Sequence, residues 1–217
     1  MRQKLKRFEE NTHLDHCIEP GKAYYNALKG KWHSHYFKND NPITLEIGCG
    51  HGAYTIGLAR LFPERNIIGI DIKGDRIWKG AKQAHLDRLT NVAFLRILVE
   101  SLDDFFEKGE INEIWITFPD PRLRNKDIKR RLTSPRFLDL YQSVLGGQGK
   151  VHVKTDSAEL YHYTIKSLQM YPVSLLKHSV DIYSMEDLDP QLSIQTTYEK
   201  RFLAMGKQIY YICFQYL

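Results

Sequence analysis

The chain has 217 residues, of which 42% are hydrophobic and 26% charged, as in an ordinary globular protein with one full core. Its net charge of +5 permits a polyanionic partner without requiring one. The three cysteines form no Cys-x-x-Cys pair, which argues against a disulfide framework or a zinc site and favours a cytoplasmic location. We expect neither a membrane span nor a signal peptide, because no apolar run is long enough and the N-terminus is charged.

Residues 1–40 are expected to form a basic extension that packs on a single domain of residues 41–217. The basic side chains near its start have two interpretations, an arm that follows phosphates or a solvated terminus. Aromatic and apolar residues then recur at roughly helical intervals, so we expect them to pack on the domain rather than stack on bases. They are Tyr24, Tyr25, Leu28, Trp32, Tyr36 and Phe37.

The domain begins with an apolar strand over 43–47, a glycine-rich turn and a helix over 53–62. Strand, turn and helix in this order predict the first unit of a doubly wound α/β sheet. Gly48 and Gly50 allow a tight turn and the close approach of a ligand, which the N–H groups of the helix start would face. Together with Ala53 they also fit a dinucleotide site, so the turn alone indicates a nicotinamide cofactor or another adenosine-bearing ligand.

Acidic residues stand near the ends of the first two strands. Glu46 directly precedes the glycines, and Asp71 ends a second apolar strand over 66–72. The carboxyl ends of parallel strands are the edge where open α/β sheets bind ligands. We therefore expect Asp71 to accept hydrogen bonds from both hydroxyls of a ribose.

Further strands are predicted over 92–97, 113–118, 150–156, 173–183 and 208–217, with helices over 74–89 and 134–146 and after Asp156. The last two strands have no long helix between them, so we expect an antiparallel pair that closes the sheet. The intervening residues 184–206 are predicted to form a loop.

Asp120 lies between Pro119 and Pro121 at the carboxyl end of the predicted strand over 113–118. Prolines restrict the backbone on both sides, so we expect a rigidly oriented carboxylate at the active site. Six of the next ten residues are basic, and a basic surface that leads to a catalytic carboxylate predicts nucleic-acid binding. The residues expected to contact the nucleic-acid backbone are Arg122, Lys126, Lys129, Arg130 and Arg131.

Two patterns resemble known families. The Glu-x-Gly-x-Gly-x-Gly stretch that starts at Glu46 resembles motif I of class I S-adenosylmethionine methyltransferases. Four motifs in order resemble the tRNA (guanine-N7-)-methyltransferase family over about residues 40–212: 118–121, 129–131, 154–156 and 196–199. The resemblance implies a Rossmann-like, mostly parallel seven-stranded sheet with an antiparallel last strand and helices on both faces.

The resemblance also implies S-adenosyl-L-methionine as cofactor and tRNA as substrate, methylated at guanosine 46 of the variable loop, without an obligatory protein partner. The cofactor would be held by Glu46, Gly48, Gly50, Asp71, Leu98 and Asp120. Asp120 would be the catalytic carboxylate. The target nucleoside would be held by Arg124, Asp156, Thr196, Thr197, Tyr198 and Glu199.

Two departures from the family pattern leave alternatives open. Leu98 stands where the family usually has an Asp near the adenine, and Arg122-Leu123-Arg124 replaces the usual Trp-Pro-Lys. The alternatives are a methyltransferase of another substrate, a tRNA-binding module that has lost turnover, and a dehydrogenase. The nine histidines show no metal-ligand spacing, so no metal site is expected.

Overall fold

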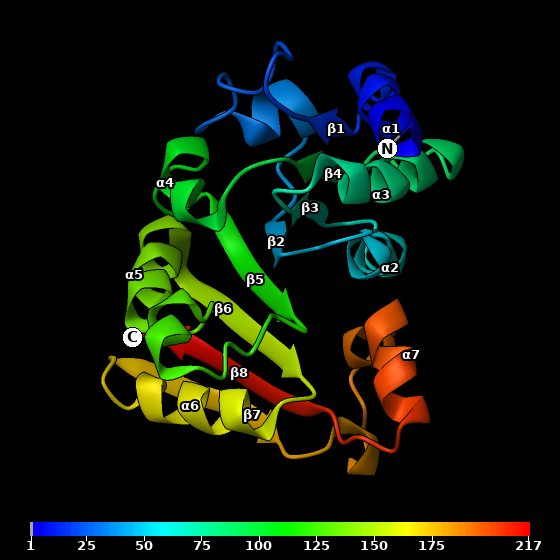
Figure 1. Cartoon of the computed structure of the whole chain (residues 1–217). Coiled ribbons are helices and arrows are strands. Elements are labelled where there is room, and N and C mark those ends of the chain that lie inside the picture. Colours follow the sequence, from blue (N-terminus) through cyan, green and yellow to red (C-terminus); the bar gives the residue numbers. More distant parts are fainter. Residues whose placement is uncertain (1) are drawn as a thin grey trace.

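The computed structural model describes residues 2–217 and contains a single mixed sheet of eight strands (Figure 1). The strand order is β1-β4-β3-β2-β5-β6-β8-β7, and every neighbouring pair is parallel except those made by β8. The bounds are β1 Cys17–Ile18, β2 Ile43–Ile47, β3 Asn66–Ile70, β4 Val92–Leu95, β5 Ile111–Thr117, β6 Leu145–Thr155, β7 Val173–Ser179 and β8 Tyr210–Tyr216. The predicted α/β class, with an antiparallel last strand, is confirmed.

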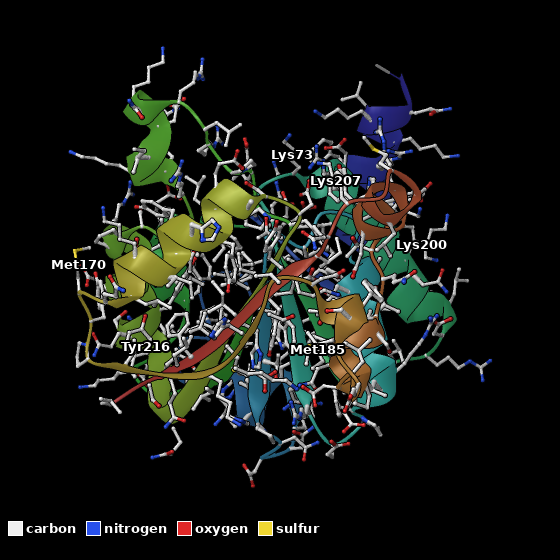
Figure 2. All side chains as sticks on the ribbon, turned by 90° about the horizontal axis from the view of Figure 1, so that it is seen from below. Lys73, Met170, Met185, Lys200, Lys207 and Tyr216 are labelled. Atoms are coloured by element: carbon white, nitrogen blue, oxygen red, sulfur yellow. The ribbon has the colours of Figure 1, made fainter. Side chains whose placement is uncertain are left out.

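Helices cover both faces of the sheet, because the central strands carry apolar side chains on each of their two faces. The helices are α1 Arg2–His13, α2 Ala53–Leu61, α3 Gly74–Leu86, α4 Leu102–Phe105, α5 Pro135–Val144, α6 Ala158–Leu168 and α7 Thr197–Ala204. One core packs α5 and α6 against the sheet, and a second packs α2 and α3 on the other side. Seen from below, β8 runs between α6 and the segment that carries Met185 (Figure 2).

Short helical turns complete the structure. A π-helix, η1, spans Trp32–Phe37, and 3-10 turns span η2 Val99–Ser101, η3 Asn125–Arg130, η4 Ile182–Ser184 and η5 Pro190–Ser193. None of the helices described is both long and apolar enough to cross a membrane.

The N-terminal extension adds a strand that the sequence analysis did not predict. Cys17 of β1 pairs with Phe94 of β4, so the sheet has eight strands rather than seven. Helix α1 packs on α3, where Asn11 Nδ2 donates to the carbonyl oxygen of Gly74 at 3.0 Å and Trp78 Nε1 donates to Glu10 at 2.7 Å. A two-residue strand carries almost no periodic signal, which is why β1 was missed.

The glycine-rich turn between β2 and α2 needs its glycines for two different reasons. Gly48, Gly50 and Gly52 have φ values of +74°, +55° and +73°, in the left-handed region. A Cβ on Gly52 would lie 2.5 Å from the Phe94 ring, so this glycine also lets α2 approach β4. Nothing lies within 4 Å of a Cβ built on Gly48 or Gly50, which leaves open space above the turn.

The loop predicted over 184–206 is wrong in its second half, where α7 forms. Thr196 is the N-cap of this helix, and its Oγ1 accepts from the backbone N–H of Glu199 at 3.0 Å. Thr-x-x-Glu is the sequence signature of such a cap, so the helix start was legible in the chain. The strand predicted over 150–156 also begins earlier than expected, at Leu145.

Candidate active site

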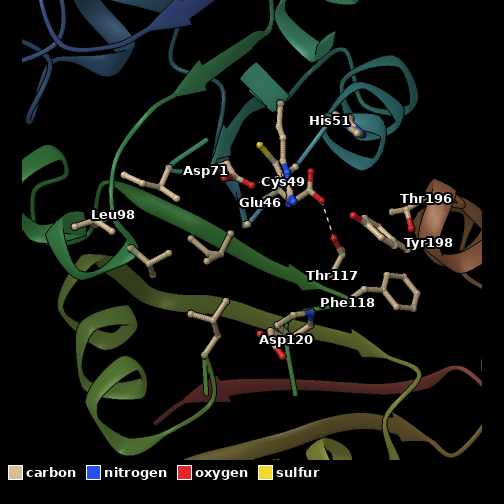
Figure 3. Close-up of a pocket in the computed structure, with 18 of the residues that line it drawn as sticks. Glu46, Cys49, His51, Asp71, Leu98, Thr117, Phe118, Asp120, Thr196 and Tyr198 are labelled. Carbon is tan, nitrogen blue, oxygen red and sulfur yellow. Dashed lines mark hydrogen bonds between the residues drawn. The ribbon is translucent and has the colours of Figure 1, made fainter. Parts of the chain in front are cut away.

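A pocket of about 450 Å³ lies at the carboxyl ends of β2, β3, β4 and β5, the edge predicted to bind ligands (Figure 3). It brings together most of the predicted site residues, from segments as far apart in the sequence as β2 and α7. Those that line it are Glu46, Gly48, Gly50, Asp71, Leu98, Asp120, Arg122, Arg130, Thr196, Thr197 and Tyr198. Arg124, Lys126, Lys129, Arg131, Asp156 and Glu199 do not line it.

Asp71 is oriented by the backbone around it. Its Oδ2 accepts from the N–H of Gly50 at 3.0 Å, and its Oδ1 accepts from the N–H of Lys73 at 2.8 Å. A carboxylate has about four lone-pair sites, so each oxygen keeps capacity for a ligand donor. The glycine turn and Asp71 therefore form one preorganised unit on this side of the pocket.

Glu46 is almost fully buried at the bottom of the pocket. It accepts hydrogen bonds from the N–H of Thr55 at 2.8 Å, from the Thr55 hydroxyl, and from the Thr117 hydroxyl at 2.7 Å (Figure 3). Burial raises the pKa of Glu46 to about 7, although these hydrogen bonds oppose the shift. Its protonation therefore changes near neutral pH.

Apolar side chains form the wall beyond Asp71. Leu98 is 54% exposed and lines the pocket together with Ile72 and Val99. Such a wall suits a planar, weakly polar group such as an adenine ring. Leu98 thus contributes an apolar contact surface to this wall.

Asp120 presents an exposed carboxylate, with 63% of its side chain accessible. The chain leaves β5 through Phe118, which has a φ of +49°, and Arg122 has the same value. Both φ values lie in the left-handed region. Two such residues on either side of Pro-Asp-Pro mark a strained turn, a feature typical of functional sites. The Nε of Arg122 lies 3.2 Å from Asp120 Oδ2, in an ion pair whose two side chains are both partly exposed.

The basic segment 122–131 is less free than its composition suggests. Arg124 and Arg130 both pair with the buried carboxylate of Asp127, with N–O distances of 2.8 and 3.4 Å, but remain about 70% exposed. Lys126 and Lys129 are exposed. Arg131 is not placed as predicted: it is buried.

Arg131 supports the turn at Asp120 instead of facing RNA. Its Nε donates to the carbonyl oxygen of Pro121 at 3.0 Å, and its Nη2 donates to that of Arg122 at 3.2 Å. The guanidinium also lies 4.3 Å from the centre of the Tyr163 ring. Its donors are thus directed at the protein, which corrects its assignment as a backbone contact.

The predicted nucleoside residues divide into two groups. Thr197 and Tyr198 are exposed and line the pocket, with Thr196 at the start of α7 behind them. Glu199 is fully buried, and Asp156 pairs with Lys207 outside the pocket. In this structure neither of these two carboxylates faces the pocket.

Comparisons with known proteins agree with this geometry. A family model described as "Putative methyltransferase" matches residues 40–212. A protein of Cytophaga hutchinsonii named tRNA (guanine-N(7)-)-methyltransferase is 47% identical over 100% of this chain and 98% of its own. A protein of the same name from Christiangramia forsetii is 45% identical over 99% of this chain and 98% of its own. Another, from Bacillus velezensis, is 39% identical over 84% of this chain and 82% of its own.

The chain belongs to the tRNA (guanine-N7-)-methyltransferase family. Solved structures support the fold of this family member. The 16S rRNA methyltransferase KamB matches with a TM-score of 0.65 at 15% identity, over 86% of this chain and 93% of the other. A geranyl diphosphate C-methyltransferase from Streptomyces coelicolor, solved with S-adenosyl-L-homocysteine, matches with a TM-score of 0.56 at 13% identity, over 92% and 88%. At these identities the likeness shows the methyltransferase fold alone.

The sequence of this methyltransferase did not predict the residues that orient the carboxylates of the site. Thr55 and Thr117 orient Glu46, and Lys154 holds Glu199. Thr55 carried a signal, because it lies in the first turn of the helix that follows the glycines, where orphan N–H groups attract a carboxylate. In the described residues no group of three or more His, Cys, Asp or Glu side chains is placed to hold a metal ion.

Proposed function

We propose that this chain transfers a methyl group from S-adenosyl-L-methionine to N7 of a guanosine in tRNA, at position 46 of the variable loop. The observation that carries the proposal is one pocket lined by the glycine turn, Glu46, Asp71 and Asp120. The likeness to relatives named tRNA (guanine-N(7)-)-methyltransferase over almost the whole chain supports the base and the atom.

The residues present fit the cofactor. The space above Gly48 and Gly50 is open, and a side chain at either position would enter it. Asp71 would hold the ribose, Leu98 would face the adenine, and Glu46 would face the cationic methionine part. When bound, the cofactor supplies an electrophilic methyl group.

Asp120 acts as a fixed negative charge rather than as a general base. Guanine N7 carries a lone pair and no proton, so the nucleophile needs no deprotonation. Positive charge develops on the base during transfer, and a preorganised carboxylate stabilises it. The turn around Pro-Asp-Pro fixes the backbone of Asp120 before the base arrives, which limits the reorganisation needed during the reaction.

Tyr198 and the exposed cations would receive the RNA. Tyr198 is 51% exposed at the pocket, and a flipped-out base of single-stranded RNA stacks well on such a ring. Lys126, Lys129 and Arg130 present positive charge on the segment that leads to Asp120. They would contact phosphates and so position the variable loop over the pocket.

The test uses two tRNA transcripts that differ only in the base at position 46. The protein is incubated with labelled S-adenosyl-L-methionine and a transcript carrying guanosine, with adenosine at the same position as control. We expect label in the first transcript alone, recovered as 7-methylguanosine. Equal labelling of both transcripts would contradict position 46, and label in neither would contradict the reaction.

A further inference from the structure

Lys154 is a buried cation that the proposed reaction does not use. It is the penultimate residue of β6, and its side chain is 0% exposed. Its Nζ donates to the backbone oxygens of Leu192 at 2.9 Å and Ile194 at 3.2 Å, and lies 2.8 Å from Oε1 of Glu199. Burial lowers the pKa of Lys154, and Glu199 opposes that shift. A charge in such surroundings persists only when its donors are satisfied, as they are here.

Glu199 is fully committed to the interior as well. Oε2 accepts from Lys154 at 3.0 Å, and Oε1 accepts from the hydroxyl of Tyr183 at 2.9 Å. Its N–H donates to Oγ1 of Thr196 at 3.0 Å. Both carboxylate oxygens and the backbone N–H of Glu199 are therefore engaged inside the protein. Glu199 does not line the pocket that its neighbour Tyr198 lines.

The segment that carries α7 lacks the support of a strand ladder. Residues 190–204 join no strand pair in the part of the chain that the structure describes. Tyr54 donates from its hydroxyl to the carbonyl oxygen of Gln191 at 2.8 Å, and Ile194 packs closely over Gly57. Phe202 of α7 packs against Phe118 at the end of β5, with ring centroids 5.7 Å apart. Lys154 adds polar contacts from the sheet and reaches the segment at three points.

We propose that Lys154 and Glu199 are positioning residues whose buried ion pair holds α7 against the end of β6 and so sets the nucleobase wall of the pocket. The inference rests on the proposed function, in which Thr197 and Tyr198 hold the target guanosine. It replaces the predicted direct contact between Glu199 and substrate. The cofactor wall stands on β2, β3 and the turn after β4, and its hydrogen bonds involve neither Lys154 nor Glu199.

The test compares Lys154→Met, Glu199→Leu and the double variant. Removing one partner leaves the other buried and unpaired, whereas removing both leaves an apolar pair. In Lys154→Met we expect kcat/KM for tRNA to fall about 100-fold and amides of 197–204 to exchange about tenfold faster. The affinity for S-adenosyl-L-homocysteine, measured by calorimetry, changes less than about threefold because the cofactor wall is intact. The double variant recovers about tenfold of the lost kcat/KM.

The matched control is Lys177→Met. Lys177 also pairs with a carboxylate of the following segment, Asp189, at 2.8 Å, but both side chains are about 40% exposed. An exposed pair contributes little, so turnover and exchange should stay at wild-type values.

If Lys154→Met does not fold, Glu199→Gln is used in its place. It keeps an oxygen that accepts from Lys154, and turnover should then fall less than about tenfold.

Three results would overturn the proposal. A double variant no more active than Lys154→Met would mean that Glu199 itself is needed, and so would a loss of turnover in Glu199→Gln with unchanged exchange of α7. A parallel loss of S-adenosyl-L-homocysteine affinity would mean that the pair supports the fold as a whole. Calorimetry and exchange need no turnover, so they test the pair even if the wild-type protein does not methylate tRNA.

Discussion

The two walls of the pocket are built in different ways. The cofactor wall comes from the neighbouring strands β2, β3 and β4 and the turns after them, and backbone N–H groups orient its carboxylate Asp71, as those of Gly50 and Lys73 do. The RNA wall joins the continuous stretch from the end of β5 through the segment 122–131 to α7, which lies far along the chain and meets that stretch only in the fold. Its carboxylates and guanidiniums are partly consumed in holding these pieces together.

This difference teaches that a charged residue in a motif has one of two roles. Asp71 and Asp120 face the pocket, whereas Glu199 and Arg131 face the protein. The two kinds look alike in the sequence, and substitution should separate them because each kind affects a different measurement.

Asp120→Asn should abolish most turnover and spare the cofactor wall. The amide keeps the shape but removes the charge that stabilises the methylated base, so we expect kcat to fall about 100- to 1,000-fold. Affinity for S-adenosyl-L-homocysteine by calorimetry should stay within about threefold, because the contacts of Glu46, Asp71 and the glycine turn are unchanged. Asp104→Asn, an exposed change on α4, is the control. A loss of affinity as large as the loss of turnover would erase the proposed division.

Glu46→Gln should weaken the binding of the cofactor and leave the KM for tRNA unchanged. It removes a buried charge that faces the cationic part of the cofactor, and charge-assisted contacts of this kind are worth about 1.5–3 kcal/mol, so affinity for S-adenosyl-L-methionine should fall about 10- to 100-fold. The KM for tRNA should remain near the wild-type value. An unchanged cofactor affinity at pH 8 would show that Glu46 serves only Thr55 and Thr117.

Arg131→Met should lower the stability of the protein, whereas Arg130→Met should weaken its contact with tRNA. Arg131→Met leaves two carbonyl oxygens near Asp120 without donors, which should cost about 1–3 kcal/mol of unfolding free energy in a thermal or denaturant melt. Arg130→Met should leave stability within about 0.5 kcal/mol and reduce the salt slope of tRNA binding by about one. Similar profiles for the two variants would show that the segment is not divided in this way.

Cofactor affinity should depend on pH around neutrality. Burial raises the pKa of Glu46 to about 7, so the carboxylate is mostly ionised at pH 8 and mostly protonated at pH 6. Affinity for S-adenosyl-L-methionine should therefore rise about tenfold over that range, and Glu46→Gln should flatten the curve. The native pKa exceeds the usual 4.5, so the native state binds more protons and the stability contribution of Glu46 falls as pH rises from about 4.5 through 7. A flat affinity profile in the wild type would contradict the charge role.

The sequence predicted the features that are local. The glycine turn, the carboxylates at strand ends and the antiparallel last strand each follow from a short pattern with one physical cause. It could not predict burial that depends on distant partners. Arg131 is buried where it donates to the carbonyl oxygens of Pro121 and Arg122, and Glu199 is buried where it pairs with Lys154, the penultimate residue of β6. Helix α7 is an intermediate case, since its capping signature was present in the chain.

The most direct test of the whole account is nucleoside analysis of bulk tRNA after methyl transfer from labelled S-adenosyl-L-methionine. The tRNA should come from cells that lack 7-methylguanosine. The account predicts one labelled nucleoside, 7-methylguanosine, that disappears with Asp120→Asn and persists with Asp104→Asn. Label in a different nucleoside, or 7-methylguanosine formed at the same rate by Asp120→Asn, would contradict it.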